Sequence, residues 1–113
     1  MTIKGLHALF YTTEPEAARA FLRDKLGFRT YDTGGGWLIS DAPEADMGCH
    51  PSDTPLHSVS FYCDDIEGTV ADLKSKGVSF LGPIREEEWG RVATFELPGG
   101  GPIDLYQPKY SKS

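Results

Sequence analysis

Hydrophobic and polar residues alternate along this chain in a pattern that predicts the same order of elements twice. The apolar and aromatic stretch 6–12 is typical of a strand. Thr13 to Glu16 then has the form of a capping box, so a helix is expected to begin there and to end at Gly27. Short strand candidates separated by turn residues follow at 28–32, 37–41 and 45–50.

The second series of elements begins after a polar linker that contains two prolines. Residues 56–63 are typical of a strand, and a helix is expected from Asp64-Asp65 to Gly77. Further strand candidates lie at 78–81, 91–97 and 102–107. The pattern predicts an α+β fold of two tandem βαβββ modules within one domain, residues 1–113. Its parts are module one at about 1–51, a linker at about 51–55, module two at about 56–108 and a C-terminal tail at 109–113.

Equivalent residues in the two halves support an internal repeat. His7 and His57 lie 50 positions apart, as do Gly27 and Gly77. Asp46 and Asp104 lie 58 positions apart, so an insertion of about eight residues is expected near 84–89 in the second half.

Composition narrows the classes of partner. With 39% hydrophobic and 25% charged residues, the 113-residue chain has enough apolar material for one core. The net charge of −6, without a basic cluster, argues against nucleic acid or a membrane as main partner but leaves cationic small molecules open. No leader or apolar span is evident, so a cytoplasmic protein is expected, with Cys49 and Cys63 reduced.

The strands of each half place a histidine near the start and an aspartate near the end. Burying an unpaired carboxylate such as that of Asp104 costs several kcal/mol, so it needs a partner or a metal. The set His7, Asp46, His57 and Asp104 suits Fe(II), Mn(II), Ni(II) or Zn(II). The register near the end of module one leaves His50 open in place of Asp46, and each histidine alone could be structural.

The faces that carry the histidines also carry apolar residues. Counted with period two, these faces predict either a pocket for a small organic ligand or simple core packing. The candidate ligand-binding residues are Leu9, Tyr11, Trp37, Val59, Phe61 and Trp89. Neither a nucleophile elbow nor a phosphate-binding loop is present, so no catalytic residue is assigned.

These motifs resemble the vicinal oxygen chelate superfamily, which includes glyoxalase I, bleomycin-resistance proteins, fosfomycin-resistance enzymes and extradiol dioxygenases. The likeness covers nearly the whole chain, from Ile3 to Pro108. The matching features are His7 followed by Glu14-Pro15, Leu26-Gly27-Phe28, His57 followed by Asp64-Asp65, Trp89-Gly90-Arg91, Leu97-Pro98-Gly99-Gly100 and Ile103-Asp104-Leu105-Tyr106-Gln107-Pro108.

The resemblance implies a glyoxalase/bleomycin-resistance-like fold, in which a curved mixed sheet surrounds a cup. It assigns a divalent metal to His7, His57 and Asp104, although the family usually has Glu where this chain has Asp104. It implies a metal-dependent lyase, isomerase or dioxygenase that chelates two oxygens of a small molecule. The alternative is a non-catalytic small-molecule or drug-binding protein of the bleomycin-resistance type. A homodimer is implied in both cases.

Overall fold

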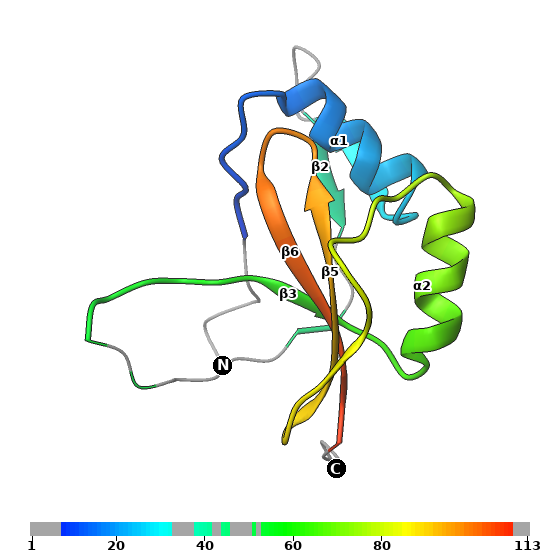
Figure 1. Ribbon diagram of the computed structural model, residues 1–113. Coiled ribbons are helices and arrows are strands. Elements are labelled where there is room, and N and C mark those ends of the chain that lie inside the picture. Colours follow the sequence, from blue (N-terminus) through cyan, green and yellow to red (C-terminus); the bar gives the residue numbers. More distant parts are fainter. Residues whose placement is uncertain (1–7, 33–37, 42–43, 46–50, 52, 110–113) are drawn as a thin grey trace.

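The computed structural model describes residues 8–32, 38–41, 44–45, 51 and 53–109. In these ranges the chain forms α1 (Pro15–Asp24), β1 (Arg29–Asp32), β2 (Leu38–Asp41), β3 (Ser60–Tyr62), α2 (Ile66–Ser75), β4 (Arg85–Glu86), β5 (Gly90–Leu97) and β6 (Gly101–Pro108). Both helices lie beside the long strands β5 and β6 (Figure 1). Neither of them has the length and apolar content needed to cross a bilayer.

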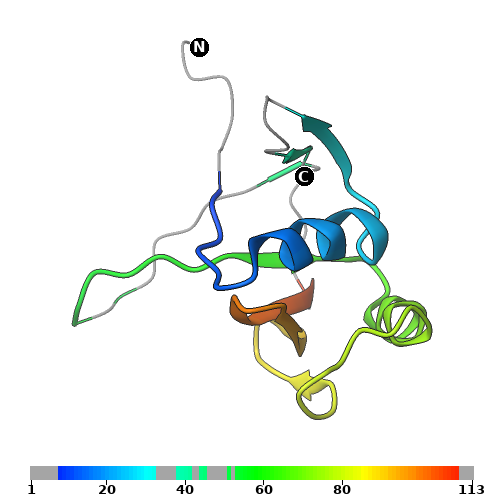
Figure 2. The same ribbon diagram turned by 90° about the horizontal axis from the view of Figure 1, so that it is seen from above.

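The strands form two sheets. β1 and β2 pair antiparallel, while the larger sheet has the order β3-β6-β5-β4, with β3 parallel to β6 and the other pairs antiparallel. Seen from above, α1 lies between the small sheet and the strands β5 and β6 of the larger one (Figure 2). The expected mixed α+β fold is therefore confirmed.

Some strands differ from their expected extent. Residues 8–12 form no strand, and the stretch expected at 78–81 contributes one bridge, from Phe80 to Phe95. β4 falls inside the expected insertion near 84–89, where no strand was predicted. Most of the candidate strand at 45–50 lies outside the described residues.

Alternation along β5 and β6 sorts their side chains between the two faces of the larger sheet. Ala93, Phe95, Leu97, Ile103 and Leu105 are buried against Ala18 of α1 and against three residues of α2, which are Ile66, Val70 and Leu73. These nine residues and Val78 make the core. Phe95 lies at the centre, 1% exposed, with its ring near those of three other phenylalanines. The strand residues between these positions point to the other face.

The capping box predicted at the start of α1 is wrong. The N-cap residue is Glu14, and its side chain makes no capping hydrogen bond. The Thr12 hydroxyl instead accepts from the Glu14 amide at 3.0 Å and donates to the Pro98 carbonyl at 2.7 Å, while the Thr13 amide donates to Gly99. The turn between β5 and β6 therefore supplies the partners that local sequence was expected to supply.

Helix α2 has the side-chain cap that α1 lacks, since the Asp65 carboxylate accepts from the Gly68 amide at 3.2 Å. Asp65→Ala should lower the free energy of unfolding by about 1 kcal/mol, because this amide then loses its partner. Glu14→Ala, at the uncapped N-cap of α1, is the matched control and should change it by less than half as much. Urea denaturation followed by circular dichroism measures both, and equal losses would contradict the assignment.

Candidate ligand-binding site

The face of the larger sheet that points away from the two helices carries a cluster of polar and aromatic side chains; it is called the opposite face below. Strand register places Ser60, Asp104 and Thr94 in one row across β3, β6 and β5. The next row contains Tyr62, Tyr106, Val92 and Arg85. Because paired residues share a face, both rows belong to the same surface.

Three aromatic rings follow one another across this face and form what we call the aromatic row. The ring centroids of Tyr62 and Tyr106 are 6.2 Å apart, and those of Tyr106 and Trp89 are 5.5 Å apart in an edge-to-face arrangement. Val92, the strand partner of Tyr106, is only 1% exposed although it is not part of the core cluster beneath the helices. The opposite face thus has a small apolar centre of its own.

Carboxylates lie at two points along the aromatic row. The Tyr62 hydroxyl donates to Glu44 Oε2 at 2.6 Å, which brings the segment after β2 to one end of the row. Asp104 precedes Tyr106 by two positions on β6, so both point to the same face. Its Oδ1 accepts a hydrogen bond from the Thr94 hydroxyl at 2.6 Å.

Trp89 and the two residues near it are held in place by Lys109, the residue directly after β6. The Lys109 amide donates to the Trp89 carbonyl at 3.0 Å, and Lys109 Nζ donates to the Glu87 carbonyl at 2.8 Å. Lys109 Nζ also lies 3.2 Å from Glu86 Oε2, and its hydrogen bond lowers the pKa of that carboxyl. These contacts fix the turn that presents the Trp89 ring.

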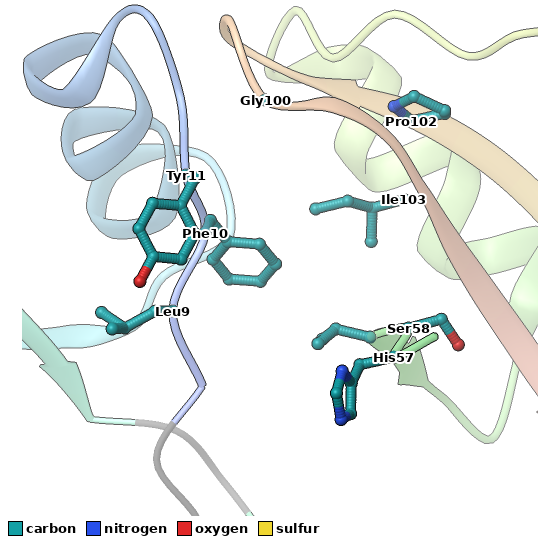
Figure 3. A pocket seen from close by; sticks show the side chains of 9 residues that line it. Leu9, Phe10, Tyr11, His57, Ser58, Gly100, Pro102 and Ile103 are labelled. Carbon is teal, nitrogen blue, oxygen red and sulfur yellow. The ribbon is translucent and has the colours of Figure 1, made fainter. Parts of the chain in front are cut away.

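A hollow of about 300 Å³ lies apart from the aromatic row, between residues 8–11 and the start of β6 (Figure 3). Leu9, Tyr11 and Val59, three of the residues predicted to bind a ligand, line it together with His57. The other lining residues are Phe10, Ser58, Gly100, Pro102 and Ile103. The residues that line this hollow are mainly apolar.

Phe61 and Trp89, also predicted as ligand contacts, do not line this hollow. Phe61 stacks on Phe95 in the core, with ring centroids 6.5 Å apart, while Trp89 ends the aromatic row. Alternation of faces along an expected strand at 56–63 places Phe61 on the same face as His57. The alternation does not hold over that distance, because β3 begins only at Ser60 and His57 lies outside it. Trp37 lies outside the described residues.

The four expected metal ligands are only partly within the described chain. His7 and Asp46, and the alternative His50, lie outside it. His57 faces the hollow, whereas Asp104 is bonded to Thr94 and has Ser60, not His57, as its partner on β3. In the ranges that the structure describes, no three His, Cys, Asp or Glu side chains come together as metal ligands. The donors seen do not by themselves fit a metal ion.

Cys63 does not have the properties of a nucleophile. Its thiol is half-buried, with Sγ 3.7 Å from the Tyr106 carbonyl, and burial raises its pKa. Since the thiolate is the reactive form, this environment keeps the group inert at neutral pH. Cys49 lies outside the described residues.

Sequence reasoning missed several residues of the opposite face. Tyr106 could have been found, because it shares the face of Asp104 two positions earlier on the same expected strand. Thr94 shares it too, once β5 and β6 are paired as a hairpin. Arg85 carried no signal, since it lies in the stretch that was treated as an insertion.

Comparison with known proteins shows which family this chain is similar to. A family model described as the Glyoxalase/Bleomycin resistance protein/Dioxygenase superfamily matches residues 5–105. The chain belongs to this superfamily. The fold of this superfamily member is thus the glyoxalase/bleomycin-resistance-like fold that the sequence motifs implied.

Three similar proteins illustrate what the superfamily member resembles. The uncharacterized protein YetH of Bacillus subtilis (strain 168) is 28% identical over 103 residues, covering 80% of this chain and 86% of YetH. The crystal structure of TnmS3, an antibiotic binding protein from Streptomyces sp. CB03234, is 28% identical with a TM-score of 0.69, covering 96% of this chain and 99% of TnmS3. Lactoylglutathione lyase from Agrobacterium tumefaciens is 16% identical with a TM-score of 0.62, covering 92% and 96% of the two chains, and shows the shared fold alone.

Proposed function

We propose that this superfamily member binds a small planar organic molecule of the antibiotic type on the opposite face of its larger sheet. The observation that carries the proposal is the aromatic row of Tyr62, Tyr106 and Trp89, with carboxylates of Glu44 and Asp104 beside it. TnmS3, which is similar over nearly the full length of both chains, is an antibiotic binding protein. Of the two functions expected from sequence, the described side chains support binding better.

The chemistry of the site favours a cationic ligand. Aromatic faces attract planar rings and cations, with about 0.5–2 kcal/mol for each cation–π contact. A carboxylate at the edge of such rings adds attraction for a positive group, and the net charge of −6 favours the approach of cations. A planar ring that carries an amine therefore matches both features.

Calorimetric titration with two probes of similar shape tests this proposal. The planar cation 9-aminoacridine should bind with a Kd of about 1–100 μM, and the anion acridine-9-carboxylate at least about tenfold more weakly. Tighter binding of the anion would contradict the assigned charge preference. Absence of saturable heat with either probe would contradict the proposed function.

A metal-dependent enzyme is the second candidate, of lyase, isomerase or dioxygenase type, acting on a small oxygenated molecule. One observation favours it: His57 lies three positions before β3, and Asp104 lies on β6, the parallel neighbour of β3. Two of the four expected ligands thus come from neighbouring segments. A bound divalent ion would supply Lewis-acid chemistry.

Thermal unfolding tests the metal directly. If the site exists, Fe(II), Mn(II), Ni(II) or Zn(II) at 100 times its Kd should stabilise the protein by about 2.7 kcal/mol and raise Tm, because the ion binds only the folded state. His57→Ala should abolish the rise. An unchanged Tm with all four ions would reject this candidate.

A homodimer completes the proposal. Residues 8–12 and 53–59 form no strand, and they expose Leu9, Tyr11 and Leu56 to 53%, 88% and 68%. Extended backbone with exposed apolar side chains is a surface on which another chain can pair. Sedimentation equilibrium should give twice the chain mass, and a monomer at micromolar concentration would contradict the proposed homodimer.

The cytoplasmic location expected from the sequence stays a prediction.

A further inference from the structure

Three side chains on the opposite face form a chain of hydrogen bonds across three strands. Arg85 of β4 donates from Nη1 to the Thr94 hydroxyl of β5 at 3.2 Å. That hydroxyl donates to Oδ1 of Asp104 on β6 at 2.6 Å. No sequence motif singled out Thr94 or Arg85, and the proposed function does not use either of them.

The direction of these bonds follows from what each group can offer. A guanidinium group only donates and a hydroxyl has one proton, so the Thr94 proton is committed to the carboxylate. A hydrogen bond from a hydroxyl to a carboxylate is charge-assisted and short, as the 2.6 Å distance shows. Thr94 is β-branched, which restricts its side-chain rotation further. Its hydroxyl therefore fixes one oxygen of Asp104.

Thr94 also separates two opposite charges. Arg85 reaches Asp104 through the threonine hydroxyl, and the ion pairs of the described residues include none between Arg85 and Asp104. A direct pair of guanidinium and carboxylate would use both oxygens of Asp104 in a bidentate arrangement. With Thr94 between them, Oδ2 of Asp104 retains its capacity to accept a hydrogen bond from a ligand.

We propose that Thr94 is a positioning residue that holds Asp104 ready for a ligand, so the site selects planar molecules whose ring carries an amine or other strong hydrogen-bond donor. This inference rests on the proposed binding function and names the residue through which the site selects its ligand class. Tyr106, two positions after Asp104 on the same face, would contact the ring, while Asp104 Oδ2 accepts from the donor group. Thr94 itself does not contact the ligand.

Selectivity between two probes tests the positioning role. Thr94→Val keeps the shape of the side chain and removes its hydroxyl, so 9-aminoacridine should bind about tenfold more weakly, the equivalent of one charge-assisted hydrogen bond. Acridine has the same rings and is neutral at pH 8. Its affinity should change by less than about twofold in Thr94→Val, because it makes no such bond to Asp104. Thr94→Ser should restore the wild-type affinity for the cation.

A double-mutant cycle separates this role from a general structural one. Asp104→Asn should itself weaken the binding of 9-aminoacridine. Adding Thr94→Val to this variant should weaken binding little further, since Thr94 acts through the Asp104 carboxylate. Equal weakening of both probes by Thr94→Val, or full additivity in the cycle, would overturn the inference.

Carbon NMR of the protein without ligand tests the positioning role of Thr94 separately from the proposed function. The Asp104 carboxyl carbon signal should move in Thr94→Val by more than it moves in Thr94→Ser, because only the serine retains a hydroxyl donor. If neither probe binds the wild-type protein, the proposed function fails, and this measurement still decides the positioning role. An Asp104 signal that Thr94→Val leaves unchanged would overturn it.

Discussion

Phe95→Ala is expected to lower the free energy of unfolding by about 3–5 kcal/mol, the usual cost of removing a buried phenylalanine side chain. Phe95 is 1% exposed on β5, and its ring lies 6.0 Å from Phe21, 6.5 Å from Phe61 and 5.9 Å from Phe80, measured between centroids. These rings come from α1, β3 and the segment after α2, so the cavity would loosen all three contacts. For a domain of this size, such a loss lowers Tm by more than about 10 °C.

Leu81→Ala is the control for this experiment, because Leu81 is a large apolar residue that is 48% exposed. Its effect should stay within about 0.5 kcal/mol, as for most surface substitutions. Differential scanning calorimetry and guanidinium denaturation measure both variants. A Phe95→Ala protein that loses less than about 1 kcal/mol would show that this ring is not the centre of the core.

Tyr106→Ala is expected to weaken binding of 9-aminoacridine at least about 30-fold, the range of a central interface residue, near 2 kcal/mol. Tyr106 is the middle ring of the aromatic row and the strand partner of the buried Val92. Its removal would separate Tyr62 from Trp89 and open Val92 to water. The variant therefore loses both a contact and the surface that excludes solvent from the ligand.

Tyr31→Ala is the control for this variant, because Tyr31 is an exposed ring on β1, outside the aromatic row, with the Arg29 guanidinium 5.4 Å from its centroid. Calorimetric titration should give this control the wild-type affinity. Tyr106→Phe should retain most of the binding, since it keeps the ring. If Tyr106→Ala is folded by circular dichroism and its Kd for 9-aminoacridine is within about twofold of the wild-type value, the ligand binds elsewhere on the protein.

Helix α2 and the hairpin of β5 and β6 could be predicted from sequence because their signals are local. Helix α2 begins after an N-cap aspartate and ends at Ser75, two residues before Gly77, and β5 and β6 flank a glycine-rich turn. These features act over a few residues, so the pattern finds them without knowledge of tertiary contacts. The helix of the first half was also found, although its predicted cap was not.

Features that depend on distant contacts could not be predicted. The capping box at Thr13 failed because Pro98 and Gly99, far along the chain, offer partners to the residues before α1. β4 has two residues, and it forms only by pairing with β5. The bond from Thr94 to Asp104 requires the pairing of β5 and β6 to be known. A single sequence states none of these pairings.

The candidate site was predicted in part. Asp104 was singled out as a charge that needs a partner, and the structure provides Thr94 as that partner. Trp89 was expected to contact a ligand, and it lies in the aromatic row. The metal site at His7, Asp46, His57 and Asp104 stays a prediction, because two of these residues lie outside the described chain.

The parallel pairing of β3 with β6 has a consequence for how the protein folds. β5 and β6 are joined by a short turn, whereas all of α2, β4 and β5 separates β3 from β6 in sequence. Closing the longer loop costs more chain entropy, so the hairpin should form first and β3 should join it late. Tyr62 reaches the aromatic row only in that late step. During refolding, ligand affinity should therefore recover later than hairpin structure, and the rate at which binding recovers should equal the rate at which β3 pairs with β6.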